Sequence, residues 1–92
     1  GGVGSTYNYA LNIYRNICAA YAKNDIAKAR EWQSRSVEVV NVIIRHGGGV
    51  RGGKAIMKVL GYDCGNCRPP FKPFSEDELD ILRGELKEIG MM

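Results

Sequence analysis

The spacing of apolar residues predicts a first helix from Tyr9 to Lys23. Its apolar positions recur at steps of three or four residues and so share one helical face: Ala10, Tyr14, Ile17 and Tyr21. Asn8 is a suitable N-cap, because its side-chain oxygen can accept from the free amides of the first turn. A short turn ends at Asp25, which can cap the helix that follows.

A second helix is predicted from Ile26 to His46. Its apolar face follows the same spacing: Ala29, Trp32, Ser36, Val40 and Ile43. The β-branched residues of the Val37–Ile44 run favour a strand instead. Helix is preferred because the run continues a good helical start and stops at Gly47–Gly49, which is typical of a C-terminus. Apolar residues surround much of this half, so we expect it to be buried on several sides.

Two further helices are predicted in the second half of the chain. Arg51 to Leu60 forms a short one that Gly61 would stop. Prolines keep Tyr62 to Phe74 irregular. The last helix opens at Ser75 with a capping box, in which Ser75 pairs with Glu78. Its buried stripe comprises Leu79, Leu82, Leu86 and Ile89.

The predicted fold is therefore all-α, with four helices after a strand remnant at Gly1–Gly4. The 92 residues suffice for one domain with a modest core. No apolar run reaches the length of a membrane span, and no signal-peptide pattern opens the chain. The net charge of +3 is too small to indicate nucleic-acid binding by itself.

Three cysteines indicate a reducing compartment, because a secreted disulfide framework is usually denser and even in number. We therefore expect a cytoplasmic protein. Cys64 and Cys67 form a C-x-x-C pair, which can hold half a zinc site or a redox disulfide. Cys18 and His46 do not complete a zinc motif. The preferred interpretation is two cysteines that line a packed loop.

Two glycine-rich segments are weak candidates for anion binding. The opening glycines lack the lysine of a phosphate loop before Ser5, and Tyr7 stands where a dinucleotide motif needs its third glycine. A strand-to-helix turn is the simpler interpretation. The segment Arg45–Lys54 mixes basic residues with glycines but has no aromatic residues for base stacking. A solvated turn, with His46 capping a helix and Lys54 on the surface rather than forming an imine, is preferred there.

Four segments, in their order and spacing, resemble the C-terminal third of the N-acetylneuraminate lyases: GGVGSTYN, DIAKAREWQ, GGKAIMKVLG and CRPPF. These lyases belong to the dihydrodipicolinate synthase superfamily. GSTYN is the most specific segment, and it favours the sialic-acid branch over the lysine-biosynthesis branch. The resemblance covers essentially the whole chain.

The resemblance implies a (β/α)8 barrel followed by three extra helices. Residues 1–23 would be the end of the eighth strand and the eighth helix, and residues 24–92 the C-terminal extension. Active sites of such barrels lie at the C-terminal ends of the strands. By resemblance, Ser5 would contact the sugar part of the substrate, Gly4 would lie with it at the pocket rim, and Val3 would form an apolar wall.

The family reaction is the reversible cleavage of N-acetylneuraminate to N-acetylmannosamine and pyruvate through a lysine imine, with a tyrosine that handles the proton. In the family both residues come from earlier strands, and a full barrel needs about 250 residues. We therefore expect a C-terminal fragment that is inactive alone. We therefore assign no catalytic residue, no cofactor and no metal site to these 92 residues.

Two alternatives of another class stay open. One is a free-standing helical interaction module, including one that binds nucleic acid through Arg45–Lys54; the other is a zinc module built on Cys64 and Cys67. Loss of the barrel would uncover apolar residues of the first two helices, so we expect a homo-oligomer. A small-molecule substrate is expected only for the whole parent enzyme, and neither a membrane nor nucleic acid is an expected partner.

Overall fold

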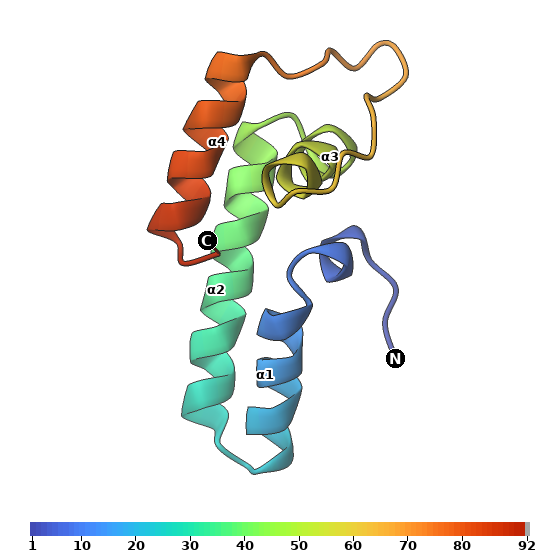
Figure 1. Cartoon of the computed structure of the whole chain (residues 1–92). Helices are drawn as coiled ribbons and strands as arrows, with labels where there is room; N and C mark the ends of the chain where they lie inside the picture. Colours follow the sequence, from blue (N-terminus) through green and yellow to red (C-terminus); the bar gives the residue numbers. More distant parts are fainter. Residues whose placement is uncertain (92) are drawn as a thin grey trace.

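The computed structural model describes residues 1–91, and within them it contains four α-helices, one short 3-10 helix and no β-strand. In chain order the elements are η1 (Ser5–Asn8), α1 (Leu11–Ala22), α2 (Ile26–Arg45), α3 (Gly49–Val59) and α4 (Glu76–Glu88) (Figure 1). The prediction of an all-α chain with four helices is confirmed.

The first helix begins later than predicted. Thr6 accepts hydrogen bonds on its carbonyl oxygen from the amides of Tyr9 and Ala10, at 3.3 and 2.8 Å, which closes a 3-10 turn before α1 can start. Asn8 therefore does not cap α1; its Nδ2 donates to the Ser5 carbonyl at 3.0 Å. Ala10, only 3% exposed, occupies the N-cap position and anchors this junction in the core.

α2 is helical from Ile26 to Arg45, one residue short of the predicted end, in spite of its β-branched residues. The Asp25 side chain accepts from the Lys28 amide at 3.1 Å, as the predicted cap requires. At the other end Gly47 has φ of 98°, and the Gly48 amide donates to the Ile43 carbonyl at 2.9 Å. This left-handed backbone is accessible to glycine at little cost, so it ends the helix.

Burial of α2 on several sides was a wrong expectation. Val39, Val42 and Ile43 are at most 4% exposed and face the core. The opposite face of the same helix leaves large apolar side chains in solvent, with Val37 48% and Ile44 66% exposed. Only one face of this apolar half is covered by the described chain.

α3 starts at Gly49, two residues before the predicted start, and crosses α2 (Figure 1). Its glycines permit close approach of neighbouring elements. A Cβ on Gly52 would lie 3.2 Å from the Ile43 carbonyl oxygen of α2, and one on Gly53 would lie 3.4 Å from the Tyr9 ring. α3 is thus held between η1 and α2 at contacts that larger residues would disturb.

α4 opens with the predicted capping box. Ser75 Oγ accepts from the Glu78 amide at 3.2 Å, and the Glu78 carboxylate accepts from the Ser75 amide at 3.4 Å. The predicted stripe is confirmed for Leu79, Leu82 and Leu86, which are buried, while Ile89 is half-buried.

The core lies where the C-terminal half of α2 meets α3 and α4, and α1 runs back along the N-terminal half of α2 (Figure 1). Its buried members are Ala10, Val39, Val42, Ile43, Ala55, Ile56, Leu79, Leu82 and Leu86. The α1–α2 hairpin extends well beyond this core, so the molecule measures 44 Å along its longest axis and 27 and 21 Å across.

Candidate functional site

Arg51 holds the start of α3 in place. α3 in turn forms one wall of a groove that Ser5 also lines. Its guanidinium donates to the carbonyls of His46 and Lys72, at 3.1 and 2.7 Å, and to Glu78 Oε2 at 2.9 Å. It also stacks 3.9 Å from the centre of the Phe74 ring. The hydrogen bond that Arg51 donates to the Glu78 carboxylate is the main cause of a lowered pKa of Glu78, and the hydrogen bond from the Ser75 amide is the second cause. Arg51 therefore joins α2, α3, the long loop and α4.

The other basic groups of the Arg45–Lys54 segment also have partners within the chain. His46 Nε2 lies 2.7 Å from Glu85 Oε2, and Arg45 Nε lies 3.5 Å from the other oxygen of that carboxylate. Lys54 Nζ donates to the Asn66 carbonyl at 3.2 Å. These contacts favour a structural role for the segment over phosphate binding.

An open groove of about 370 Å³ lies along the contact between η1 and α3. Its lining residues are Ser5, Asn8, Tyr9, Gly49, Val50, Gly53, Lys54, Met57 and Cys64. The lining brings together a serine hydroxyl, a lysine amine and a thiol on an apolar floor. We call this feature the η1–α3 groove.

The three residues that the resemblance selected lie in a row before and at the start of η1. Ser5 is exposed, and a Cβ on Gly49 would lie 3.6 Å from its Oγ, which places the hydroxyl against the start of α3. Gly4 has extended backbone, with φ of −167° and ψ of 155°. Val3 is fully exposed. Of the three, Ser5 alone belongs to the described lining of the η1–α3 groove.

Tyr9 is a groove residue that the sequence did not single out. Its ring packs on Gly53, and its Oη is buried with no hydrogen-bond partner among the described residues. Burial raises the pKa of Tyr9, Tyr14 adds to that effect and the Ser5 side chain opposes it. The hydroxyl is therefore protonated at neutral pH and has an unused donor. The only sequence signal was the spacing of Gly49 and Gly53, which indicates close packing on one face of α3.

Lys54 and the C-x-x-C pair meet at the far side of the groove. Cys64 lines it, while Cys67 lines the neighbouring cavity together with Lys58. Lys54 belongs to both linings, so its interpretation as a plain surface residue was incomplete. All three cysteines are free. Among residues 1–91, no group of three or more His, Cys, Asp or Glu side chains is placed to hold a metal ion.

No helix in the part of the chain that the structure describes is long and apolar enough to cross a bilayer. The helical arrangement itself matches that of solved N-acetylneuraminate lyases. The enzyme from Proteus mirabilis superimposes with a TM-score of 0.89 at 26% identity, over 99% of this chain and 30% of that one. The enzyme from Aliivibrio salmonicida gives a TM-score of 0.87, also at 26% identity, over 99% of this chain and 30% of its own.

Residues 1–89 match the model of the dihydrodipicolinate synthetase family, and the chain belongs to this family. N-acetylneuraminate lyase 2 of Escherichia coli O6:H1 is 37% identical over 83 residues, which are 89% of this chain and 27% of that protein. N-acetylneuraminate lyase of Gallus gallus is 36% identical over 90 residues, which are 97% of this chain and 29% of that protein. The chain thus spans under a third of the length of these relatives.

Proposed function

We propose that this chain forms the C-terminal part of a class I lyase that cleaves N-acetylneuraminate to N-acetylmannosamine and pyruvate. The observation that carries this proposal is the GSTYN segment, whose Ser5 follows an extended stretch and opens onto a groove, in a chain similar to N-acetylneuraminate lyases. In this proposal residues 1–23 are the last strand end and helix of a barrel, and residues 24–92 are its helical extension.

The chain's own residues bind and orient the substrate in this proposal. The Ser5 hydroxyl can both donate to and accept from a sugar hydroxyl. Gly4 keeps the adjacent backbone open for close approach, and Val3 presents an apolar side chain beneath the reacting carbon. By resemblance, the imine lysine and the tyrosine that handles the proton belong to other parts of the whole enzyme, so residues 1–92 contribute positioning rather than bond cleavage.

The test places the chain in the matching segment of the Escherichia coli O6:H1 relative and measures pyruvate release from N-acetylneuraminate. We expect turnover, and Ser5→Ala should lower kcat/KM by roughly 2–10-fold, as the loss of one neutral hydrogen bond would. Ser34→Ala, on the exposed surface of α2, is the matched control and should leave kcat/KM unchanged. Equal values for the two variants would remove Ser5 from the site.

The chain alone should neither release pyruvate nor be trapped by borohydride as a pyruvate imine. Turnover by the pure 92-residue species would overturn the assignment of the imine lysine to another part of the enzyme.

We also propose that the isolated chain forms a homo-oligomer through a second, apolar groove on α1. This groove of about 580 Å³ is lined by Gly2, Tyr7, Leu11, Tyr14, Arg15, Ile17, Cys18 and Gln33. Tyr7 is 38% and Leu11 45% exposed. Contiguous exposed apolar surface of this kind drives association, and a two-fold dimer is the simplest closed form. The free cysteines favour a cytoplasmic location for it.

Light scattering at micromolar concentration tests the association. We expect a dimer. Leu11→Glu places a charge in the apolar groove and should therefore shift the dimer to monomer. The helix should stay intact, because the carboxylate lies at the positive N-terminal end of α1. Ile81→Glu, which changes an apolar residue of α4 that is at least as exposed as Leu11, should not shift the dimer to monomer. A stable 10.2 kDa monomer of the unmodified chain would contradict this part of the proposal.

A further inference from the structure

We infer that Cys64 and Cys67 form a reversible dithiol–disulfide site around Lys54, with a small-molecule disulfide such as oxidised glutathione as its oxidant. Two residues, Gly65 and Asn66, separate the cysteines in the loop between α3 and α4. Both thiols are free. This spacing is the one that thiol–disulfide oxidoreductases use for reversible disulfides. The site does not depend on lyase activity.

The two cysteines line two neighbouring cavities, and Lys54 belongs to the lining of both. Cys64 is exposed on the η1–α3 groove, where its Sγ is 3.6 Å from the Tyr62 carbonyl oxygen. Cys67 is half-buried and lines the neighbouring cavity. Lys54 lines both the η1–α3 groove and this cavity, and its Nζ donates to the carbonyl of Asn66, which lies between the two cysteines in the sequence. In the reduced chain Lys54 therefore holds the turn.

The turn itself is able to rearrange. Gly65 has φ of 81°, in the left-handed region that glycine adopts freely, and its amide donates to Asp63 Oδ1 at 3.0 Å. Residues 61–66 are exposed, so little packing opposes a change in their backbone. Hydrogen bonds that are exposed in this way can exchange with water at small net cost.

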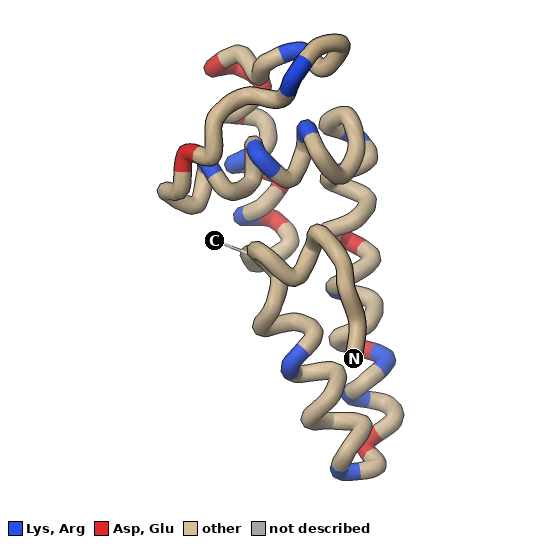
Figure 2. The backbone as a smooth tube through the Cα atoms, turned by 90° about the vertical axis from the view of Figure 1, so that its right-hand side faces the viewer, with Lys and Arg blue, Asp and Glu red and all other residues tan. Residues whose placement is uncertain are grey.

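The surroundings of Cys67 carry positive charge. Its cavity is lined by Arg51, Lys54, Lys58 and Lys72, and the described lining includes no carboxylate. The Arg51 charge is compensated by Glu78, at 2.9 Å, whereas no ion pair is described for the lysines. Figure 2 shows Lys and Arg positions gathered on α3 and the loop after it. This field attracts an anionic oxidant such as oxidised glutathione.

The reaction proceeds in two exchanges. The exposed thiolate of Cys64 attacks one sulfur of the oxidant, the S–S bond of the oxidant breaks, and one glutathione thiolate leaves. The thiolate of Cys67 then attacks the Cys64 sulfur of the mixed disulfide and displaces the second glutathione. The cysteines lose two protons and two electrons; the oxidant takes the electrons, and its two thiolates take up protons from water.

Oxidation should also change the η1–α3 groove. Because the two cysteines line different cavities, joining them should move the turn and draw the Asn66 carbonyl away from Nζ. The freed amine then faces the groove that Ser5 lines. The site thus connects the redox state of the loop to the shape and charge of the groove.

The experiment uses the full chain with Cys18→Ser, which removes the exposed thiol on α1. The chain is equilibrated in glutathione buffers of increasing oxidised fraction, quenched with acid and weighed by mass spectrometry. We expect loss of two hydrogen atoms, with no glutathione attached, and full recovery by reductant. Added Cys64→Ser or Cys67→Ser should instead retain one glutathione. A chain that keeps its thiols or stops at the mixed disulfide, or zinc held stoichiometrically by both thiols, would overturn the inference.

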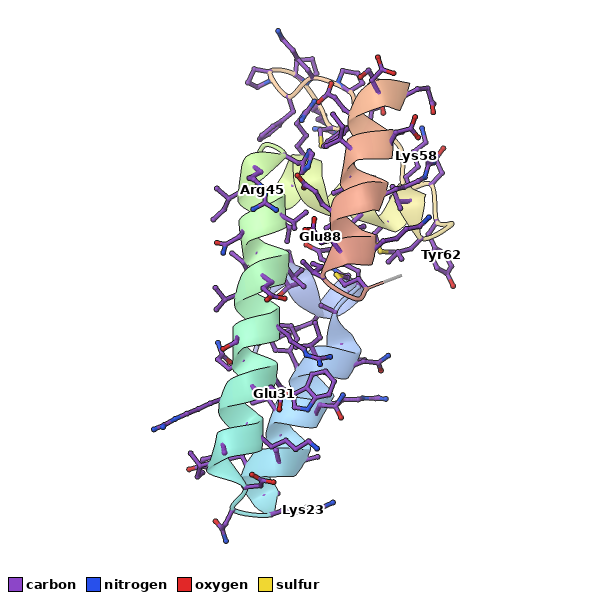
Figure 3. The ribbon with its side chains drawn as sticks, turned by 90° about the vertical axis from the view of Figure 1, so that its left-hand side faces the viewer. Lys23, Glu31, Arg45, Lys58, Tyr62 and Glu88 are labelled. Carbon is purple, nitrogen blue, oxygen red and sulfur yellow. The ribbon has the colours of Figure 1, made fainter. Side chains whose placement is uncertain are left out.

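A second pair of variants tests the part played by Lys54. Lys54→Met removes the hydrogen bond that holds the reduced turn, so the equilibrium constant for disulfide formation should rise roughly fivefold. Lys58→Met is the matched control, because it removes the same charge one helical turn away and no hydrogen bond from Lys58 to the loop is described (Figure 3). Equal shifts in the two variants would show that Lys54 does not restrain the turn.

Discussion

The two ends of α2 differ in how they are held. At the C-terminal end Val39, Val42 and Ile43 are at most 4% exposed and pack into the core with α3 and α4. At the N-terminal end, among described residues 26–35, Ala29 alone is buried, and α1 runs beside this part of α2 (Figure 1). Figure 3 shows these two ends, marked by Arg45 and by Lys23 of the adjoining turn.

This difference shows which apolar side chains the chain buries with its own elements. Large apolar residues stay exposed along the hairpin, such as Tyr21 at 69% and Ile26 at 42%. The C-terminal end of α2 closes a core on one of its faces, with Val37 and Ile44 exposed on the other, whereas the hairpin buries few of its apolar side chains. This pattern agrees with the proposed position of the chain as part of a larger barrel, in which α1 and α2 would be covered from both sides.

The largest expected effect is the loss of core packing at the closed end. Leu82 is fully buried on α4, so Leu82→Ala should lower the free energy of unfolding by about 2–5 kcal/mol. Ile81→Ala, which truncates the neighbouring residue at 58% exposure, should change it by less than about 0.5 kcal/mol. Urea unfolding followed by circular dichroism measures both. Comparable losses would mean that α4 does not carry the core.

The next effect separates a half-buried ion pair between α3 and α4 from an exposed pair within α4. Arg51→Met removes the charge-assisted bond to Glu78 and the bonds to the carbonyls of His46 and Lys72, so it should lower Tm the most of the three variants below. Arg83→Met breaks an exposed pair with Asp80, at 2.8 Å, and should cost less than about 0.5 kcal/mol. Arg51→Lys should be intermediate, because lysine cannot reproduce the forked contacts. Thermal unfolding of the three variants gives the ranking.

Local patterns predicted most of the fold, because helix ends depend on near neighbours. The caps at Asp25 and Ser75 and the stop at Gly47 were read correctly, since each needs only a side chain or a glycine within a few residues. The start of α1 was missed because the 3-10 turn that closes on the Thr6 carbonyl has no marked sequence signal, and because the burial of Ala10 depends on the core.

The candidate site was less predictable. GSTYN pointed to Ser5, but the opposite wall of the groove comes from α3, more than forty residues later, and no local pattern pairs the two. The role of Arg51 was also hidden, because its partners lie on α2, the long loop and α4. The prediction for the exposed face of α2 was wrong. An apolar run shows which side chains can be buried, but it does not show whether other elements are present to cover them.

Acid should weaken the closed end before the hairpin. The pKa of Glu78 is lowered in the folded chain, chiefly by Arg51, so its contribution to stability is complete above the ordinary pKa of glutamate and is lost as pH falls through the lowered value. Glu78→Gln keeps the capping-box geometry and removes the charge. Stability of this variant should vary less with pH below about 5 than that of the unmodified chain. Equal acid slopes in urea unfolding would contradict a role for this charge.

The smallest effect concerns Tyr9, where the hairpin joins the core. Its buried hydroxyl has no partner within the described chain, so Tyr9→Phe should be neutral or slightly stabilising. Tyr14→Phe is the matched control, because its Oη lies 2.8 Å from Thr6 Oγ1 and its loss should cost about 1 kcal/mol.

The pH dependence gives Tyr9 a second signature. Burial raises its pKa, so its contribution to stability is complete below the ordinary pKa of tyrosine and is lost as pH rises through the raised value. Tyr9→Phe should therefore flatten the decline in stability above about pH 10. If Tyr9→Phe instead destabilises the chain as much as Tyr14→Phe, the Tyr9 hydroxyl has a hydrogen-bond partner in solution. The buried polar groups where the hairpin joins the core would then all be hydrogen-bonded.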